Sequence, residues 1–159
     1  DFIIEEHKIL IPTDPSNVFQ QICKIGGGYG WNHANFLWQT RGWLDRFLGG
    51  VGLHRGRRDL FSLRVGDSVD FWRVEKLELN QELLLRSEMI TPGLSWLQFR
   101  LNSVDESSTL LTLRAHFIPK PFWGNIYWLA LSYFHSYIFK GMLEYFKKLS
   151  MRHQEKNQM

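Results

Sequence analysis

The sequence predicts an α+β domain in which a curved antiparallel sheet wraps around one long C-terminal helix. Three observations lead to this class: a strand-like run over residues 2–10, about five strand-like runs with short turns in the middle, and a long apolar helical pattern near the end. With 159 residues, 44% of them hydrophobic, the chain suits one domain with one core. We expect that domain over residues 1–150 and a polar, frayed tail over residues 151–159.

Two short helices follow the first strand. Thr13 or Asp14 followed by Pro15 predicts a helix start, because these residues cap a helix and proline fits its first turn. This helix should reach Lys24 and end at a glycine cluster. Leucines at helical spacing predict a second helix over residues 34–48, which is closed by further glycines.

The middle of the chain reads as a meander of strands. Turn pairs such as Gly66-Asp67 and Pro92-Gly93 separate runs near residues 59–64, 69–79, 82–91, 95–104 and 108–118. Such short connections require antiparallel neighbours. Alternation predicts that the sheet turns one apolar face towards the terminal helix, made of Leu97, Phe99 and Leu101 on one strand and Leu111, Leu113, Ala115 and Phe117 on the next.

After Pro119 and Pro121, a helix over about residues 123–149 carries one apolar stripe, formed by Trp128, Leu131, His135, Ile138, Met142 and Leu149. The stretch over residues 122–143 is long enough to span a bilayer, but polar residues interrupt it, so a buried core helix is the favoured interpretation. This order of elements is that of the helix-grip fold, which leaves a cavity between sheet and helix.

Charge and cysteine content narrow the classes of partner. The 19 basic and 16 acidic residues are spread along the chain, so a nucleic-acid partner is not indicated. Cys23, the single cysteine, predicts no disulfide and favours a reducing, cytoplasmic setting. The glycine cluster before Trp31 lacks the third glycine of a dinucleotide motif, and the histidines lack metal-ligand spacing. We therefore predict no cofactor and no metal.

A family resemblance rests on a series of runs in order: Gly27-Gly28-Tyr29-Gly30-Trp31, Gly49-Gly50-Val51-Gly52, Asp70-Phe71-Trp72-Arg73-Val74-Glu75, Ser95-Trp96-Leu97, Tyr127-Trp128 and Gly141-Met142. Over about residues 26–142 the chain resembles a bacterial family of unknown function that is commonly fused behind an NAD(P)-binding, nucleoside-diphosphate-sugar-epimerase-like domain. The resemblance implies the START and polyketide-cyclase-like (SRPBCC) superfamily, whose members mostly bind apolar or amphipathic small molecules. It implies no known reaction.

Two positions depart from the family pattern. Gln98 stands where the family more usually carries Glu, and Pro121-Phe122 replaces an expected Gly-Leu pair. The resemblance therefore does not carry a catalytic acid to position 98.

The first hypothesis for function is a small-molecule-binding module that serves an attached NAD(P)-binding domain. Its predicted ligand-binding residues are Trp31, Trp38, Trp72, Trp96, Trp128 and His135 as walls, with Arg41, Arg73 and Glu88 as polar contacts. The alternative for Arg73 and Glu88 is a solvated outer face of the sheet. His135 is either a satisfied core histidine or a contact in the cavity, and both versions predict a buried ring with a polar partner.

Two further hypotheses stay open. An enzyme would use His135 with a carboxylate such as Glu88 for acid and base chemistry on an enolisable or cyclising substrate. A peripheral lipid-handling protein is suggested by the Trp and Tyr density over residues 122–137, although membrane contact is the weaker alternative. Independently, Arg55, Arg57 and Arg58 form either an anion-binding turn or a solvated basic turn.

Overall fold

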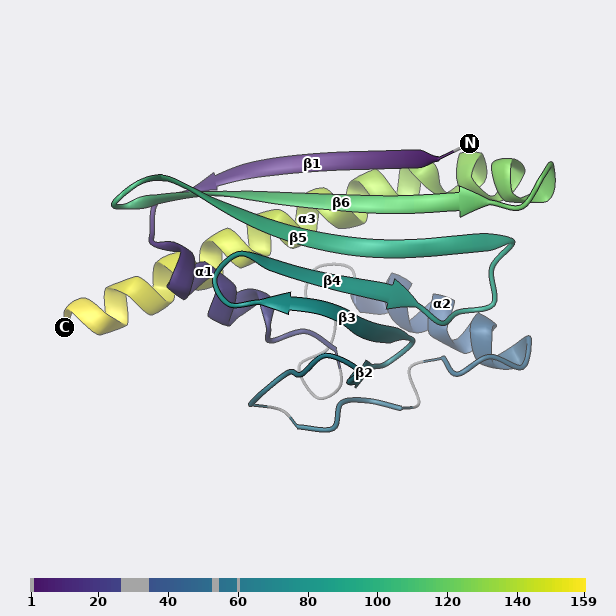
Figure 1. Ribbon diagram of the computed structural model, residues 1–159, viewed down its shortest axis with the longest axis horizontal. Helices are drawn as coiled ribbons and strands as arrows, with labels where there is room; N and C mark the ends of the chain where they lie inside the picture. The colour runs from purple at the N-terminus through teal and green to yellow at the C-terminus, as the bar shows by residue number, and fades with distance from the viewer. Residues whose placement is uncertain (1, 27–34, 53–54, 60) are drawn as a thin grey trace.

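The computed structural model describes residues 2–26, 35–52, 55–59 and 61–159. In this part of the chain the elements follow in the order β1 (Ile3–Ile11), α1 (Pro15–Ile22), α2 (Asn35–Phe47), β2 (Ser68–Val69), β3 (Trp72–Glu78), β4 (Glu82–Ser87), β5 (Gly93–Asp105), β6 (Ser108–Pro119) and α3 (Trp123–Gln158). The strands form one antiparallel sheet in the order β1-β6-β5-β4-β3-β2, and α3 lies across one of its faces (Figure 1). The predicted helix-grip arrangement is confirmed.

The core lies between the inner face of the sheet and the second half of α3. The predicted alternation is confirmed, because β5 and β6 pair Leu97 with Ala115, Phe99 with Leu113 and Leu101 with Leu111, and all six side chains are buried. From α3, Phe146 is fully buried and meets the ring of Phe99 edge-on, with ring centroids 5.8 Å apart. Burying a side chain of this size contributes about 1.5–3 kcal/mol.

The strand predicted near residues 59–64 does not form among the residues described there, 59 and 61–64. The Asp59 carboxylate instead accepts hydrogen bonds from the Phe61 backbone N–H at 2.8 Å and from the Ser62 hydroxyl at 3.0 Å. A carboxylate so close in sequence offers the backbone an alternative to a strand ladder. The prediction is wrong because it weighs the apolar residues and overlooks this local turn.

Two other predicted strands are shorter than expected. The run over residues 69–79 is divided into β2 and β3 by a turn at Asp70, whose φ of 55° lies in the left-handed region that Asp tolerates. The run over residues 82–91 leaves the sheet after Ser87, and Ile90 then donates its backbone N–H to a side chain of α2. This second break brings the segment after β4 against α2.

The terminal helix α3 continues to Gln158, well past the predicted end near Leu149, so the tail predicted to be frayed is helical. Residues 150–158 contain no Gly or Pro and include several strong helix formers. The backbone carbonyl of Ser150 accepts a hydrogen bond from Asn17 Nδ2 at 2.7 Å, which joins this part of α3 to α1. Over the described part of the chain, no helix combines the length and apolarity needed to cross a membrane.

The buried carboxylate of Asp45 helps to hold α2 in place. Asp45 is fully buried and accepts hydrogen bonds from the backbone N–H groups of Ile90 at 2.6 Å and Gly52 at 2.9 Å. This side chain therefore joins α2 to the loop that follows it and to the segment after β4. Gly50 permits the close approach, because a Cβ atom there would lie 2.3 Å from Asp45 Oδ2.

Replacing Asp45 with Ala should strongly destabilise the fold. The change leaves two backbone donors without an acceptor, and each such loss costs about 1–3 kcal/mol, so the free energy of unfolding should fall by about 2–6 kcal/mol. Urea unfolding followed by circular dichroism measures this. Asp59→Ala is the matched control, since its carboxylate caps an exposed turn and should cost less than about 1 kcal/mol. Equal small losses in both variants would show that Asp45 does not hold α2.

Candidate ligand-binding site

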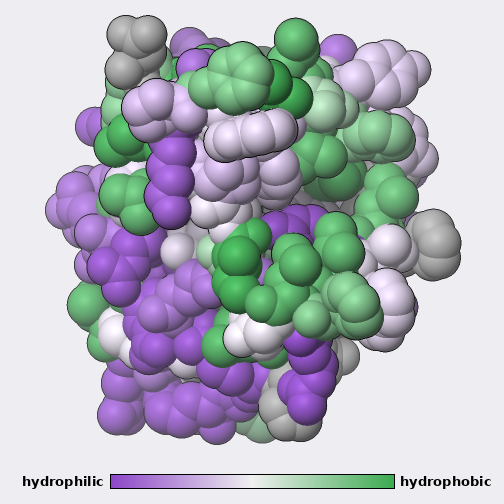
Figure 2. All heavy atoms as spheres, turned by 90° about the vertical axis from the view of Figure 1, so that its right-hand side faces the viewer, coloured by the Kyte–Doolittle hydropathy of each residue, from purple (hydrophilic) through white to green (hydrophobic). Residues whose placement is uncertain are grey.

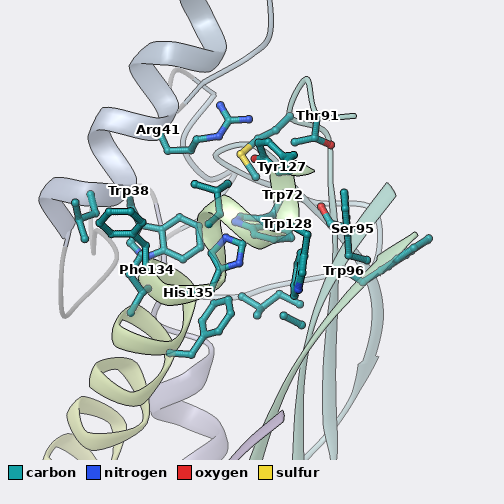
Figure 3. Close-up of a pocket in the computed structure, with 18 of the residues that line it drawn as sticks. Trp38, Arg41, Trp72, Thr91, Ser95, Trp96, Tyr127, Trp128, Phe134 and His135 are labelled. Carbon is teal, nitrogen blue, oxygen red and sulfur yellow. The ribbon is translucent and has the colours of Figure 1, made fainter. Parts of the chain in front are cut away.

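A cavity of about 290 Å³ lies between the inner face of the sheet, α2 and the first half of α3 (Figure 3). Its walls are mostly apolar, and aromatic rings dominate them, including Trp38, Trp72, Phe117, Trp128, Phe134 and Phe139. The described residues that line it include Arg41 and His135 but no Asp or Glu. The cavity is therefore suited to an apolar molecule that meets a small number of polar groups.

Ring packing fixes the shape of the walls. Trp128 of α3 stacks on Phe117 of β6, with ring centroids 5.2 Å apart and an interplanar angle of 15°. These rings enclose His135, which lies 5.1 Å from Trp128 and stacks at 5.4 Å on Phe139 one helical turn later. On the α2 side, Trp38 is packed 5.8 Å from the ring of Phe71. The cavity is thus lined by rings that support one another.

His135 faces the cavity from α3, and its Nδ1 atom is buried without a hydrogen-bond partner among the described residues. The predicted polar partner is therefore not found at this nitrogen, because aromatic rings occupy the space around the imidazole. Burial, with a further contribution from the positive charge of Arg41, lowers the pKa of His135 to about 4. The ring is neutral at pH 7.

Arg41 supplies the charged group of the cavity wall. Its Nη2 donates to the backbone carbonyl of Ile90 at 3.0 Å. Its Nη1 is buried and has no hydrogen-bond partner among the described residues, since the carboxylate of Asp45 is 3.9 Å away. That carboxylate already accepts the two backbone N–H groups that fix α2. The guanidinium is therefore held at Nη2 by a hydrogen bond to the protein, whereas the N–H groups of Nη1 make no hydrogen bond to the described residues.

The structure brings together five of the predicted ligand-binding residues, namely Trp38, Arg41, Trp72, Trp128 and His135. Trp31 lies outside the described residues. Trp96 borders the cavity, but its neighbour Leu97 is buried on the inner face, so alternation places the Trp96 ring on the outer face. Its indole N–H donates there to Glu75 at 2.8 Å. Trp96 is thus a poor candidate for a wall that touches a ligand.

Arg73 and Glu88 do not line the cavity. They belong to an ion-pair cluster outside it, in which Glu88 Oε1 accepts hydrogen bonds from Arg55 at 2.7 Å and Arg73 at 3.1 Å. Desolvation opposes ionisation of Glu88, but the two arginines outweigh it and hold the pKa of this carboxyl below its usual value. Glu88 is therefore an ionised structural partner, and the structure does not bring it together with His135.

The three arginines of the predicted anion-binding turn do not converge on one point. Arg55 pairs with Glu88 and also donates to the backbone carbonyl of Asp70 at 2.9 Å. Arg57 donates to the carbonyl of Cys23 at 2.6 Å, and Arg58 binds the carboxylate of Asp67 at 3.0 and 3.1 Å. Each guanidinium joins different segments of the chain, which favours a structural role over the capture of an external anion.

Sequence reasoning missed several residues of the cavity. Phe139 stands four residues after His135 on the same helix face, so helical spacing alone could have identified it. Ser95 shares the inward face of β5 with Leu97, so strand alternation could have identified it too, whereas Phe134 and Thr91 carry weaker signals. Within the described part of the chain, no cluster of three or more His, Cys, Asp or Glu residues is placed to hold a metal ion.

Solved structures with the same architecture share little sequence with this chain. The aromatase/cyclase Zhui from Streptomyces sp. R1128 is 13% identical, with a TM-score of 0.55 over 96% of this chain and 95% of that chain. Norcoclaurine synthase from Thalictrum flavum, solved with dopamine and hydroxybenzaldehyde, is 12% identical, with a TM-score of 0.56 over 96% and 88%. A Staphylococcus aureus protein of unknown function is 11% identical, with a TM-score of 0.55 over 100% and 98%. At these identities the likeness shows the fold alone.

Sequence comparison identifies the family. A search of curated protein sequences gave no match. Residues 3–142 match a family described as proteins of unknown function, DUF2867, and this span covers the sheet, the first two helices and every described residue that lines the cavity. The chain therefore belongs to the DUF2867 family.

Proposed function

We propose that this protein binds a small, largely apolar molecule in the cavity between the sheet, α2 and α3. The observation that carries the proposal is the lining: aromatic rings on several sides, with two polar side chains whose buried nitrogens lack partners among the described residues. Small-molecule sites commonly combine apolar walls with a few polar groups that orient the ligand. The volume of about 290 Å³ lies near the lower end of such sites, which favours a compact ligand.

The solved neighbours give limited support for the ligand class. One of them is an aromatase/cyclase, and another holds dopamine and hydroxybenzaldehyde, which are small aromatic molecules. The aromatic walls of this cavity favour a ligand of the same kind, since flat rings stack well between aromatic side chains. The resemblance noted from the sequence further favours a module that serves an attached NAD(P)-binding domain, and the full-length gene would test that arrangement.

Filling the cavity should abolish the binding of a neutral aromatic probe. We expect 1-aminoanthracene to bind the wild-type protein with a rise in fluorescence, and Leu131→Trp to weaken this binding at least tenfold, roughly the effect of losing 1.4 kcal/mol. Leu131 lines the cavity, whereas Leu129 on the same helix is 77% exposed, so Leu129→Trp is the matched control. Circular dichroism checks that both variants fold. Absence of probe binding in the wild type, or equal binding in all three proteins, would overturn the proposal.

An enzymatic role through acid and base chemistry has less support. The described residues that line the cavity include no carboxylate to pair with His135, and Glu88 is held by two arginines outside it. A histidine with a pKa of about 4 is also a weak base at neutral pH. These observations favour His135 as a neutral polar contact for a ligand over a proton-transfer catalyst.

His135 should make the stability of the protein depend on pH. Below its usual pKa of 6.5 the unfolded chain takes up a proton that the folded chain refuses, so stability falls as pH decreases from 6.5 towards 4. Between pH 7.5 and pH 4.5 this contribution should amount to roughly 2–3 kcal/mol. Urea unfolding of wild type and His135→Gln at both pH values isolates it, because other groups titrate alike in both. The same pH dependence in both proteins would contradict a buried neutral imidazole.

A second candidate function, lipid handling at a membrane surface, is favoured by aromatic side chains exposed beside the cavity. Helix α2 exposes Trp43 by 69% and Phe47 by 75%, and α3 exposes Trp123 by 68% and Tyr133 by 81%. Figure 2 shows apolar and weakly polar side chains gathered over the end of the molecule where these helices lie. Soluble monomers rarely expose so much apolar surface, and Trp and Tyr favour membrane interfaces.

The charges near these rings favour an anionic lipid surface. Arg46 of α2 and Lys120, just before α3, are exposed, and the sequence contains no acidic residue between Glu106 and Glu144. Basic residues close to a membrane surface are attracted by anionic lipids, at about 1 kcal/mol each. The aromatic and basic groups together give this end of the molecule the chemistry of a membrane-facing surface.

Liposome sedimentation distinguishes this second candidate. Vesicles of phosphatidylcholine with 30% phosphatidylglycerol should sediment the wild-type protein, and Trp43→Ser with Phe47→Ser should reduce the bound fraction at least fivefold, roughly 1 kcal/mol. The control is Leu79→Ser with Val104→Ser, which removes exposed apolar side chains at the opposite end of the sheet (Figure 1). Failure of the wild type to sediment, or equal losses in both double variants, would remove this candidate.

A further inference from the structure

We infer that the ligand of the cavity is a carboxylate-bearing aromatic molecule whose anionic group binds Arg41. This inference rests on the proposed binding function and names the chemical class of its ligand. It depends on three features of the described residues: the donors that Arg41 has to offer, the absence of acidic side chains from the lining, and the second polar group at His135.

The guanidinium of Arg41 is half satisfied. The bond from Nη2 to the Ile90 carbonyl fixes its orientation, while the buried Nη1 has no acceptor among the described residues. Asp45 cannot swing towards it without releasing the backbone N–H groups of Ile90 and Gly52. A buried cationic donor without an acceptor is costly, so a small shift of the Arg41 side chain that brings Nη1 against a ligand oxyanion would gain a charge-assisted hydrogen bond.

Charge complementarity points in the same direction. Arg41 is the cationic side chain among the described lining residues, and no Asp or Glu shares the lining. Electrostatic attraction is stronger beside apolar walls than in water. Asp45, 3.9 Å from Nη1, offsets part of this charge without accepting a hydrogen bond from it, so a neutral ligand would leave that bond unmade, whereas a carboxylate would supply the acceptor. The site therefore favours one negative charge over none.

His135 adds a second polar contact. In a neutral imidazole one ring nitrogen donates and the other accepts, so His135 can offer the ligand a polar contact without adding charge. Figure 3 places Arg41 towards one side of the cavity and His135 deeper between the aromatic rings. A flat molecule with a carboxylate at one end would thus meet Arg41 with its charge and the Trp38, Trp72 and Trp128 walls with its ring.

A matched pair of competitors tests the inference. At pH 7.5, 2-naphthoate and 2-naphthamide have nearly the same shape and differ by one negative charge. Each is titrated against bound 1-aminoanthracene. We expect the wild-type protein to bind naphthoate at least tenfold more tightly, which is roughly the effect of one charge-assisted hydrogen bond.

Variants on α2 locate the source of this preference. Arg41→Gln should erase the preference for naphthoate, so that this variant binds naphthoate and naphthamide with nearly equal affinity. Arg46→Gln removes an exposed charge from the same helix and should keep the preference. Arg41→Lys, which retains the charge but not the forked geometry, should keep part of it. If Arg41→Gln fails to fold, the comparison of wild type with Arg41→Lys and Arg46→Gln still decides the matter.

The possible results distinguish failure of the carboxylate inference from failure of the proposed small-molecule-binding function. Wild-type protein that binds 1-aminoanthracene but does not prefer naphthoate would overturn the carboxylate class and leave the binding function intact. A preference that survives in Arg41→Gln, or one that is unchanged in Arg41→Lys and lost in Arg46→Gln, would remove Arg41 as the anchor. Wild-type protein that binds no probe would defeat the binding function itself.

Discussion

The structure depends on how α3 lies along the sheet. Its second half packs closely, because Met142, Leu143 and Phe146 are buried against the inner face and close the core. Its first half carries the rings of Trp128 and His135, which border the cavity, and Trp128 also stacks on Phe117 of β6. One helix thus completes the core with one half and bounds the cavity with the other. The remaining wall must come from elsewhere, and α2 supplies it.

Polar side chains on the outer face of the sheet and polar side chains in the cavity differ in how fully they are hydrogen-bonded. On the outer face, Glu82 accepts from Lys76 at 2.8 Å and from Gln98 at 2.6 Å, and Gln98 in turn bonds the ring of His116 at 2.9 Å. Inside, Arg41 Nη1 and His135 Nδ1 make no hydrogen bond to the described residues. Buried polar atoms normally find partners, so these two nitrogens of the cavity wall are exceptions to a general rule.

The fold could be predicted from the sequence where local patterns and packing agree. The alternation that places Leu97 and Leu113 inward is strict, and a slip of one residue would have exposed the whole apolar face. The strand predicted near residues 59–64 failed because the hydrogen bonds of Asp59 decide the backbone there. The end of α3 was misplaced because polar residues permit a helix as readily as a frayed tail.

The site was only partly predictable for a different reason. The tryptophans in the sequence are candidates for the cavity wall, but the sequence alone does not show which way each ring points. In the structure Trp38 and Trp128 line the cavity, while the Trp96 ring lies on the outer face of the sheet. For Glu88 the deciding factor is the position of Arg55, which lies 33 residues away in sequence. Such pairings follow from the tertiary structure and leave no periodic trace along the chain.

The attachment of α2 also bears on how a ligand enters and leaves. This helix packs sparsely on the other described helices and strands, and its attachment depends on the carboxylate of Asp45, the hydrogen bond from Arg41 to Ile90 and the buried ring of Trp38. Segments with few buried contacts open locally at a lower free energy than the core. Of the cavity walls, the one formed by α2 should therefore cost least to open, and its position depends on the hydrogen bonds of one buried carboxylate.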